Sequence, residues 1–247
     1  MKIIDLELRT HKLEEMKRFY TGKIGFPLEH QTEDSFTVRV GVTKLTFVRE
    51  GSDTIPYYHF AMNIPENQIT EAKEWLTRQG CTIMNAEPME YMHIQADANI
   101  AYFKGTDAHA LYFEDPSGNL LEFIARHRMQ NTSAKPFDVS SILNISEIGF
   151  PLRNTVPEAI EILGSQTDVT PYIGDGKSFQ MMGDDHGMFI LGDLEIGWYP
   201  TRKIPEIHPI RMSVLHDRNE AFRLHGYPYD IRTIAPTSIT LGERIQS

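Results

Sequence analysis

The opening residues of the chain alternate between polar and apolar side chains, which predicts a β-strand over residues 2–9. The polar face of this strand carries Asp5, Glu7 and Arg9. Apolar residues then recur at helical spacing from Leu13 to Tyr20, and a glycine at position 25 is placed to end that helix. Strands are predicted next over 36–40 and 44–50. The first unit is therefore a strand, a helix and further strands.

The same order of elements recurs in the following residues. A strand over 59–64 precedes a helix that opens at Pro65 and ends at Gly80, with an apolar stripe at Ile69, Ala72, Trp75 and Leu76. Four strands are then predicted, over 81–85, 100–105, 110–115 and 119–126. Internal duplication explains the two passes, which together fill residues 1–128.

A polar segment over 129–138 reads as a linker to a third pass. This pass has a strand over 145–152, a helix over 156–163, and strands over 179–183 and 188–192. A fourth unit is visible only as strands at 210–215 and 229–234. The pattern predicts two domains: a double unit over 1–128, and a degenerate or truncated second domain over 129–247.

The repeated strand-helix-strands unit predicts an α+β fold. Short hairpins favour antiparallel neighbours, and each helix must cover one face of its sheet. Tandem βαβββ modules are therefore expected to form open, curved, mixed β-sheet barrels with the helices on the outer face. The polar positions of the alternating strands would line the concave face.

Charge and cysteine content narrow the classes of function. The chain has 24 Lys and Arg residues against 34 Asp and Glu, a net charge of −10, which disfavours binding to nucleic acid or to an anionic membrane surface. Cys81 is the single cysteine and cannot form an internal disulfide. Charged residues interrupt the first ten positions, and no apolar run is long enough to span a bilayer. We therefore expect a cytoplasmic protein.

One hairpin carries the most specific motif. The string LYFEDPSGNLLEF, residues 111–123, contains two strands joined by an Asp-Pro-Ser-Gly turn, with Glu122 among apolar residues of the returning strand. Together with the FY and GF pairs of the first unit and the string HFAMNIPENQITEAKEWL, it resembles the vicinal oxygen chelate superfamily. That superfamily includes glyoxalase I, bleomycin-resistance proteins and extradiol ring-cleaving dioxygenases.

The resemblance implies a divalent metal and a small-molecule substrate with two neighbouring oxygens. The superfamily's metal positions, on the first and last strand of each module, fall on Asp5, Thr46, His59 and Glu122. Three of these, Asp5, His59 and Glu122, can bind a metal. Two carboxylates in the set favour iron(II) or manganese(II) over zinc. Each residue also has an ordinary structural explanation. Glu122 could be an outward-facing carboxylate, His59 a hydrogen-bonded strand histidine, and Asp5 a salt-bridged strand aspartate.

The closing hairpin further resembles the tail of extradiol dioxygenases. By that resemblance Tyr112 would donate a hydrogen bond to the substrate oxygen, although a packed strand aromatic is an equal alternative. The acid-base histidine of those enzymes has no counterpart near 103–105, so that role is unfilled unless His109 or His93 supplies it from a different strand. The alternative for both is a solvated histidine in a loop or at a strand end. A ring-cleaving dioxygenase is the leading hypothesis. The alternatives are a glyoxalase-like isomerase or lyase, which the threonine at 46 disfavours, and a metal-free binding protein.

The C-terminal half is expected to pack against the first half and to shape or cover its cavity. Glu147 falls at the first-strand metal position of the third unit, but no partner is evident at its closing position, so we expect no metal site there. Modules of this superfamily often pair across chains, although two domains in one chain could pair internally. A homodimer is favoured.

Overall fold

Two curled, mixed β-sheets form the computed structural model, which describes residues 1–86, 92–94 and 97–236. The side chains of 92–94 are outside this description. One sheet has seven strands in the order β15-β16-β14-β1-β4-β3-β2, and the other has nine in the order β11-β12-β13-β10-β5-β9-β8-β7-β6. This confirms the α+β fold with open, curved sheets.

The chain builds the two sheets from four consecutive units. The first unit contains β1 (Lys2–Thr10), α1 (Leu13–Lys17) with a further helical turn η1 (Arg18–Lys23), β2 (Leu28–Gln31), β3 (Ser35–Val40) and β4 (Thr43–Arg49). The second contains β5 (His59–Ile64), α2 (Ile69–Arg78), β6 (Met92–Ile94), β7 (Ala101–Phe103), β8 (Ala108–Glu114) and β9 (Leu120–Arg126). Two short helical turns, η2 (His127–Met129) and η3 (Val139–Ser141), lie at the two ends of the linker.

The remaining two units are smaller. The third contains β10 (Asn144–Leu152), α3 (Val156–Thr167), β11 (Pro171–Gly174), β12 (Phe179–Asp184) and β13 (Gly187–Asp193). The described elements of the fourth are the strands β14 (Ile210–Leu215), β15 (Glu220–Arg223) and β16 (Tyr229–Ile234). The strand expected over 81–85 is wrong, because Ile83 makes only an isolated bridge to Phe113.

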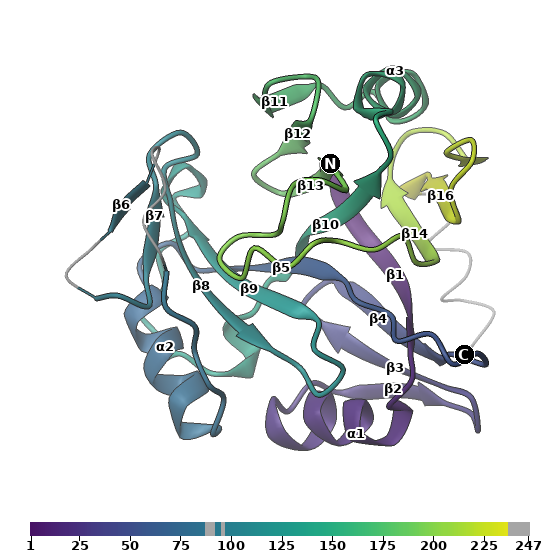
Figure 1. Cartoon of the computed structure of the whole chain (residues 1–247). Helices are drawn as coiled ribbons and strands as arrows, with labels where there is room; N and C mark the ends of the chain where they lie inside the picture. The colour runs from purple at the N-terminus through teal and green to yellow at the C-terminus, as the bar shows by residue number, and fades with distance from the viewer. Residues whose placement is uncertain (87–91, 95–96, 237–247) are drawn as a thin grey trace.

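The units pair in a nested order. The first unit joins the fourth through antiparallel pairing of β1 with β14, and the second joins the third through antiparallel pairing of β5 with β10. Figure 1 shows these four strands at the centre of the molecule, with the helices at its periphery. Each sheet therefore combines strands from both sides of residue 128. The division of the chain into domains at 1–128 and 129–247 stays a prediction. These two segments do not coincide with the two sheets.

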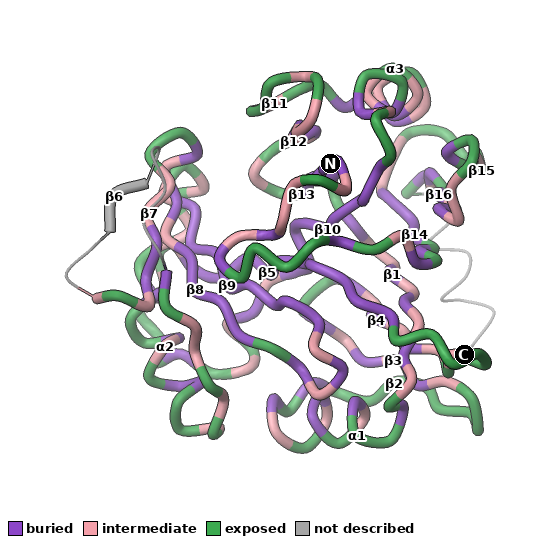
Figure 2. The backbone as a smooth tube through the Cα atoms, in the orientation of Figure 1, coloured by how far each residue is buried: buried purple, intermediate pink, exposed green. Residues whose placement is uncertain are grey.

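One continuous apolar core lies between the sheets and their helices. It contains the apolar positions of β1, β5, β9 and β10 together with the inner residues of α1, α2 and α3. Trp75 on α2, for example, packs against Phe123 on β9 and Phe137 in the linker. A second, smaller cluster fills the opposite, concave face of the nine-stranded sheet, around Ala61, Tyr112, Ile190 and Trp198. Figure 2 shows that the central strands are buried along most of their length.

The Asp-Pro-Ser-Gly-Asn turn ties the second unit to the first. The Asp115 carboxylate accepts hydrogen bonds from the backbone N–H groups of Ser117 and Asn119 and from the Tyr20 hydroxyl, at 2.9–3.1 Å. The Ser117 hydroxyl bonds Thr10 at the end of β1. The turn thereby fixes where β9 starts, and with it the position of Glu122.

Candidate metal centre

Three buried side chains converge on the concave face of the nine-stranded sheet. They are His59 on β5, Glu122 on β9 and Glu147 on β10, and their ligand atoms all lie within 4.8 Å of one another. Strand register explains the convergence. Ala61 pairs with Glu122 on one side of β5 and with Glu147 on the other, and His59 lies two residues earlier on the same face. The small side chain of Ala61 leaves room for all three.

The imidazole of His59 is oriented as a metal ligand would be. Its Nδ1 lies 3.2 Å from the carbonyl oxygen of Leu120, and Nε2 lies 3.6 Å from the Glu122 carboxylate. Donation from Nδ1–H to that carbonyl leaves the lone pair on Nε2, facing the carboxylates. Burial lowers the pKa of His59 below its usual value, although Glu147 and the Leu120 contact act in the opposite direction. The ring is therefore neutral at pH 7.

The two carboxylates differ in their partners. Arg126, whose side chain is fully buried, forms an ion pair with Oε1 of Glu147 and also bonds Asn63 at 3.1 Å. Burial raises the pKa of Glu122 well above its usual value and Glu147 raises it further, whereas Arg126 and a hydrogen bond from Tyr112 lower it. One guanidinium thus faces two buried carboxylates, so Glu122 needs a proton or a second cation.

These residues fit a divalent metal ion. Ligand distances of about 2.0–2.2 Å place two ligands of one ion at most about 4.4 Å apart, close to the 4.8 Å limit found here. A neutral imidazole and two carboxylates, one without a matching cation, form a suitable donor set. Small side-chain movements would complete the coordination.

The ionisation of Glu122 gives a testable pH dependence. Because its folded pKa is raised, the stabilisation that its proton confers is complete below the unfolded pKa and is lost as pH rises through the folded one. We expect chelator-treated protein to melt at progressively lower temperature as the pH rises above the usual titration range of a glutamate. Glu122→Gln should flatten this slope, whereas Glu114→Gln, at an exposed position of β8, should keep it. Parallel slopes for wild type and Glu122→Gln would contradict the assignment.

Tyr112 lies beside the three ligands. It pairs with Glu122 across the β8-β9 hairpin and bonds its carboxylate. Burial and the carboxylates of Glu122 and Glu147 raise the pKa of the Tyr112 phenol well above its usual value, so the hydroxyl is a donor at neutral pH.

Two residues expected at the site lie elsewhere. Asp5 is on β1 of the seven-stranded sheet, because the first unit pairs with the fourth and not with the second. Glu147 lies with His59 and Glu122 instead, so a residue of the C-terminal half, where no metal site was expected, belongs to the group that could hold a metal. The signal for Glu147 was its first-strand position, and the missing information was which units pair.

His109 points to the other face of the sheet. It is three residues from Tyr112 on β8, so the two side chains lie on opposite faces. Its Nδ1 is 2.6 Å from Nε2 of His127. His109 therefore does not reach Glu122. The other histidine considered for the acid-base role, His93, is on β6, and its side chain lies outside the described residues.

The fourth metal position of this sheet is apolar. Parallel pairing sets Ala61 opposite Glu122 on β9 and, in the third unit, Gly149 opposite Ile190 on β13. Glu147 lies two residues before Gly149, just as His59 lies two residues before Ala61. Ile190, the partner of Gly149, therefore occupies the place that corresponds to Glu122, the partner of Ala61. The site has three side chains that could hold a metal, and an aliphatic side chain in the fourth place.

Trp198 covers the site. It follows β13, is 4% exposed, and its ring centroid lies 5.4 Å from that of His59. Glycines make the space for the indole, because a Cβ at Gly149 would lie 2.7 Å from the ring and one at Gly192 3.1 Å from it. The next residue, Tyr199, packs its ring edge-on against Tyr112 at 5.4 Å. Under this cover His59, Glu122 and Glu147 are only 6%, 3% and 4% exposed.

Comparison with known proteins gives a family match for about half of the chain. Residues 2–123 match the family described as the Glyoxalase/Bleomycin resistance protein/Dioxygenase superfamily. No curated protein sequence matches the chain. Among its described residues, no helix is both long and apolar enough to cross a membrane.

Solved structures share the fold over the whole chain at low sequence identity. A Bacillus subtilis protein described as a "putative dioxygenase" has a TM-score of 0.59 and 13% identity, covering 100% of this chain and 94% of that one. A V278E mutant of glyoxalase I from Zea mays has a TM-score of 0.56 and 13% identity, covering 98% and 94%. The arrangement of all four units is therefore found in other proteins.

Proposed function

Since the chain belongs to the glyoxalase/bleomycin resistance protein/dioxygenase superfamily, we propose that it is an enzyme that binds a divalent metal through His59, Glu122 and Glu147. Its substrate would be a small molecule with two neighbouring oxygens, and the reaction an oxygen-dependent ring cleavage of the extradiol type. The observation that carries the proposal is the convergence of three buried donors with Ile190 in the fourth place. Three protein ligands on one face leave coordination positions open for a chelating substrate and for dioxygen.

The chain's own residues have separable roles in this proposal. A bound metal would act as a Lewis acid towards the two substrate oxygens. His59 is held by the Leu120 carbonyl so that Nε2 faces the ion. The Tyr112 hydroxyl, which stays protonated, would donate a hydrogen bond to the nearer substrate oxygen. Trp198 and Tyr199 would keep bulk water away, which strengthens these polar interactions.

The donor set also supports a choice of metal. Two carboxylates and one imidazole form an oxygen-rich site, which suits iron(II) or manganese(II) better than zinc. Because Arg126 already pairs with Glu147, the net charge of the three ligands and the arginine is −1 when Glu122 is ionised. A bound divalent ion would therefore keep a net positive charge.

Two other functions are favoured by specific observations. A glyoxalase-like isomerase or lyase needs a carboxylate that can accept a proton, and the pair of Glu122 and Glu147 could supply one. A metal-free binding protein is favoured by the capacity of Glu122 to stay protonated, since a neutral carboxyl needs no metal ion beside it. Metal content separates the first two functions from the third.

The primary test measures metal in protein purified anaerobically without chelator or a His tag, by elemental mass spectrometry. We expect near-stoichiometric iron or manganese in the wild type and loss of most of it in His59→Ala and Glu147→Gln, because each removes one of three ligands. Asp5→Asn and His109→Ala are matched controls that should keep the metal. Retention in Glu147→Gln with loss in Asp5→Asn would refute the assigned ligands. No metal in any protein, even after loading with iron(II), manganese(II) or zinc(II), would refute the metal-dependent mechanism.

Loaded protein then distinguishes the reactions. Oxygen consumption with a panel of catechols, measured with an oxygen electrode, is expected for the ring-cleaving enzyme. Turnover of aldehyde and thiol adducts without oxygen uptake would indicate the isomerase instead.

A further inference from the structure

The concave face of the seven-stranded sheet has an open polar groove, in contrast to the filled face of the other sheet. Two adjoining cavities, of about 910 Å³ and about 210 Å³, share the lining residues Glu7, Arg211, Arg223 and Asp230. The larger volume lies within the range of small-molecule sites. Strands β1, β14, β15 and β16 supply most of the walls.

Register shows why this groove differs chemically from the buried site. Glu7 pairs with Thr46 on β4 and with Arg211 on β14, as Ala61 pairs with Glu122 and Glu147. The places of the three ligands are thus taken by Asp5, Thr46 and Arg211. Among described residues, the groups able to hold a metal are the buried one and an exposed one at Asp168, His216 and Asp217, and neither lies here. A guanidinium in place of Glu147 favours an anionic ligand.

Arginines gather along this groove although the chain carries a net charge of −10. The two cavities are lined by four arginines, at positions 9, 211, 223 and 232, and by three carboxylates, at positions 5, 7 and 230. Arg211 pairs with Glu7 at 3.2 Å and with Asp230 at 3.6 Å, and Arg223 pairs with Asp230 at 2.6 Å. Asp230 is thus shared by two guanidiniums. Within the described part of the chain, Arg9 and Arg232 have no ion pair.

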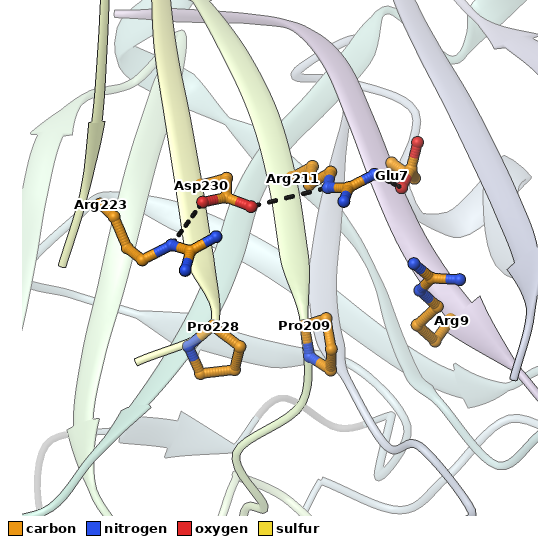
Figure 3. A pocket seen from close by; sticks show the side chains of 7 residues that line it. All are labelled: Glu7, Arg9, Pro209, Arg211, Arg223, Pro228 and Asp230. Atoms are coloured by element: carbon orange, nitrogen blue, oxygen red, sulfur yellow. Dashed lines mark hydrogen bonds and ion pairs between the residues drawn. The ribbon is translucent and has the colours of Figure 1, made fainter. Parts of the chain in front are cut away.

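Three of these arginines surround the smaller cavity. Figure 3 shows Arg9 and Arg223 on opposite sides of it, Arg211 between them, and Pro209 and Pro228 along one wall. The ion pair of Arg223 uses its Nε, and those of Arg211 use Nε and Nη1, so other N–H donors of both side chains are outside these pairs. Guanidiniums suit carboxylate and phosphate because they donate in a planar fork.

We propose that this end of the groove binds the anionic head, a carboxylate or a phosphate, of a small organic acid between Arg9 and Arg223, with Arg211 as a third donor. The rest of the acid would extend into the larger cavity towards Arg232. This site is separate from the metal centre and does not rest on the function proposed for it.

Isothermal titration with inorganic phosphate and with succinate, at low ionic strength, tests the proposal on the whole protein. We expect saturable binding of at least one probe, and methylammonium should give none. Arg9→Gln and Arg223→Gln should each weaken binding by about tenfold or more, since a hydrogen bond to a charged group contributes about 1.5–3 kcal/mol. Arg78→Gln, which removes the same charge from the exposed face of α2, is the matched control and should bind as the wild type does.

Two results would overturn the proposal. One is the absence of saturable heat with both anions. The other is equal affinity in Arg78→Gln and in Arg9→Gln or Arg223→Gln, which would show that the anion binds outside this site. Melting curves confirm that the variants fold. Competition between phosphate and succinate identifies which head group is preferred.

Discussion

Replacement of Arg126 by methionine is expected to lower the free energy of unfolding by about 3–5 kcal/mol. The guanidinium is fully buried, pairs with Glu147, bonds Asn63, and lies 3.7 Å from Asp185. Its removal leaves the Glu147 carboxylate buried beside Glu122 without a counter-charge. Urea unfolding of chelator-treated protein at pH 7 measures the effect.

An exposed arginine two residues later provides the control. Arg128 bonds the Tyr172 hydroxyl and the Gly105 carbonyl at the surface, and Arg128→Met should cost less than about 1 kcal/mol. The double variant Arg126→Met with Glu147→Gln should recover much of the loss, because the uncompensated carboxylate is then gone. Similar losses for the two single arginine variants would show that the Arg126 ion pair does not hold the second and third units together.

Trp198→Ala is expected to destabilise the protein about as much as Arg126→Met does. It should also open access to the candidate metal site. Removing a buried indole costs about 3–5 kcal/mol and leaves a cavity directly over His59. In manganese-loaded protein we expect a chelator to extract the metal about tenfold faster or more, since local opening no longer has to displace the indole. Stopped-flow mixing with a fluorescent chelator gives the rate.

Trp75 is the matched control for this change. It is also buried, but it packs between α2 and the outer face of β9 against Phe123 and Phe137. Trp75→Ala should therefore destabilise the protein without speeding metal release at moderate temperature. Equal release rates from the two alanine variants would mean that global unfolding, and not the Trp198 cover, controls access.

Alternation along the strands predicted much of the fold correctly. Period-two patterns located β1, β5, β8 and β9, and helical spacing located α1, α2 and α3. Edge strands β2 and β11 are short and lack a buried face of their own, so no clear pattern marks them. The nested pairing of units is not encoded locally. It depends on which strand edges meet, and these are set by contacts between segments up to about two hundred residues apart.

The same limits explain what the sequence revealed of the candidate site. His59 and Glu122 lie in one unit, where the register of neighbouring strands follows from a single repeat, and the structure brings them together. Asp5 was grouped with them on the assumption that adjacent units share a sheet. The position of His109 could have been read from the sequence, because residues 109 and 112 of one strand necessarily face opposite ways. Trp198 gave no signal, since it lies in a connection without periodicity.

The nested order of the sheets also constrains the sequence of events during synthesis. All strands of the nine-stranded sheet lie between residues 59 and 193, so that sheet can be complete while the ribosome is still adding the fourth unit. Strand β1 is made first but meets its antiparallel neighbour β14 only once residues 210–215 have emerged. One edge of the oldest strand therefore stays open through most of translation, and the charged residues at positions 5, 7 and 9 that flank it are of the kind that discourages association with other nascent chains.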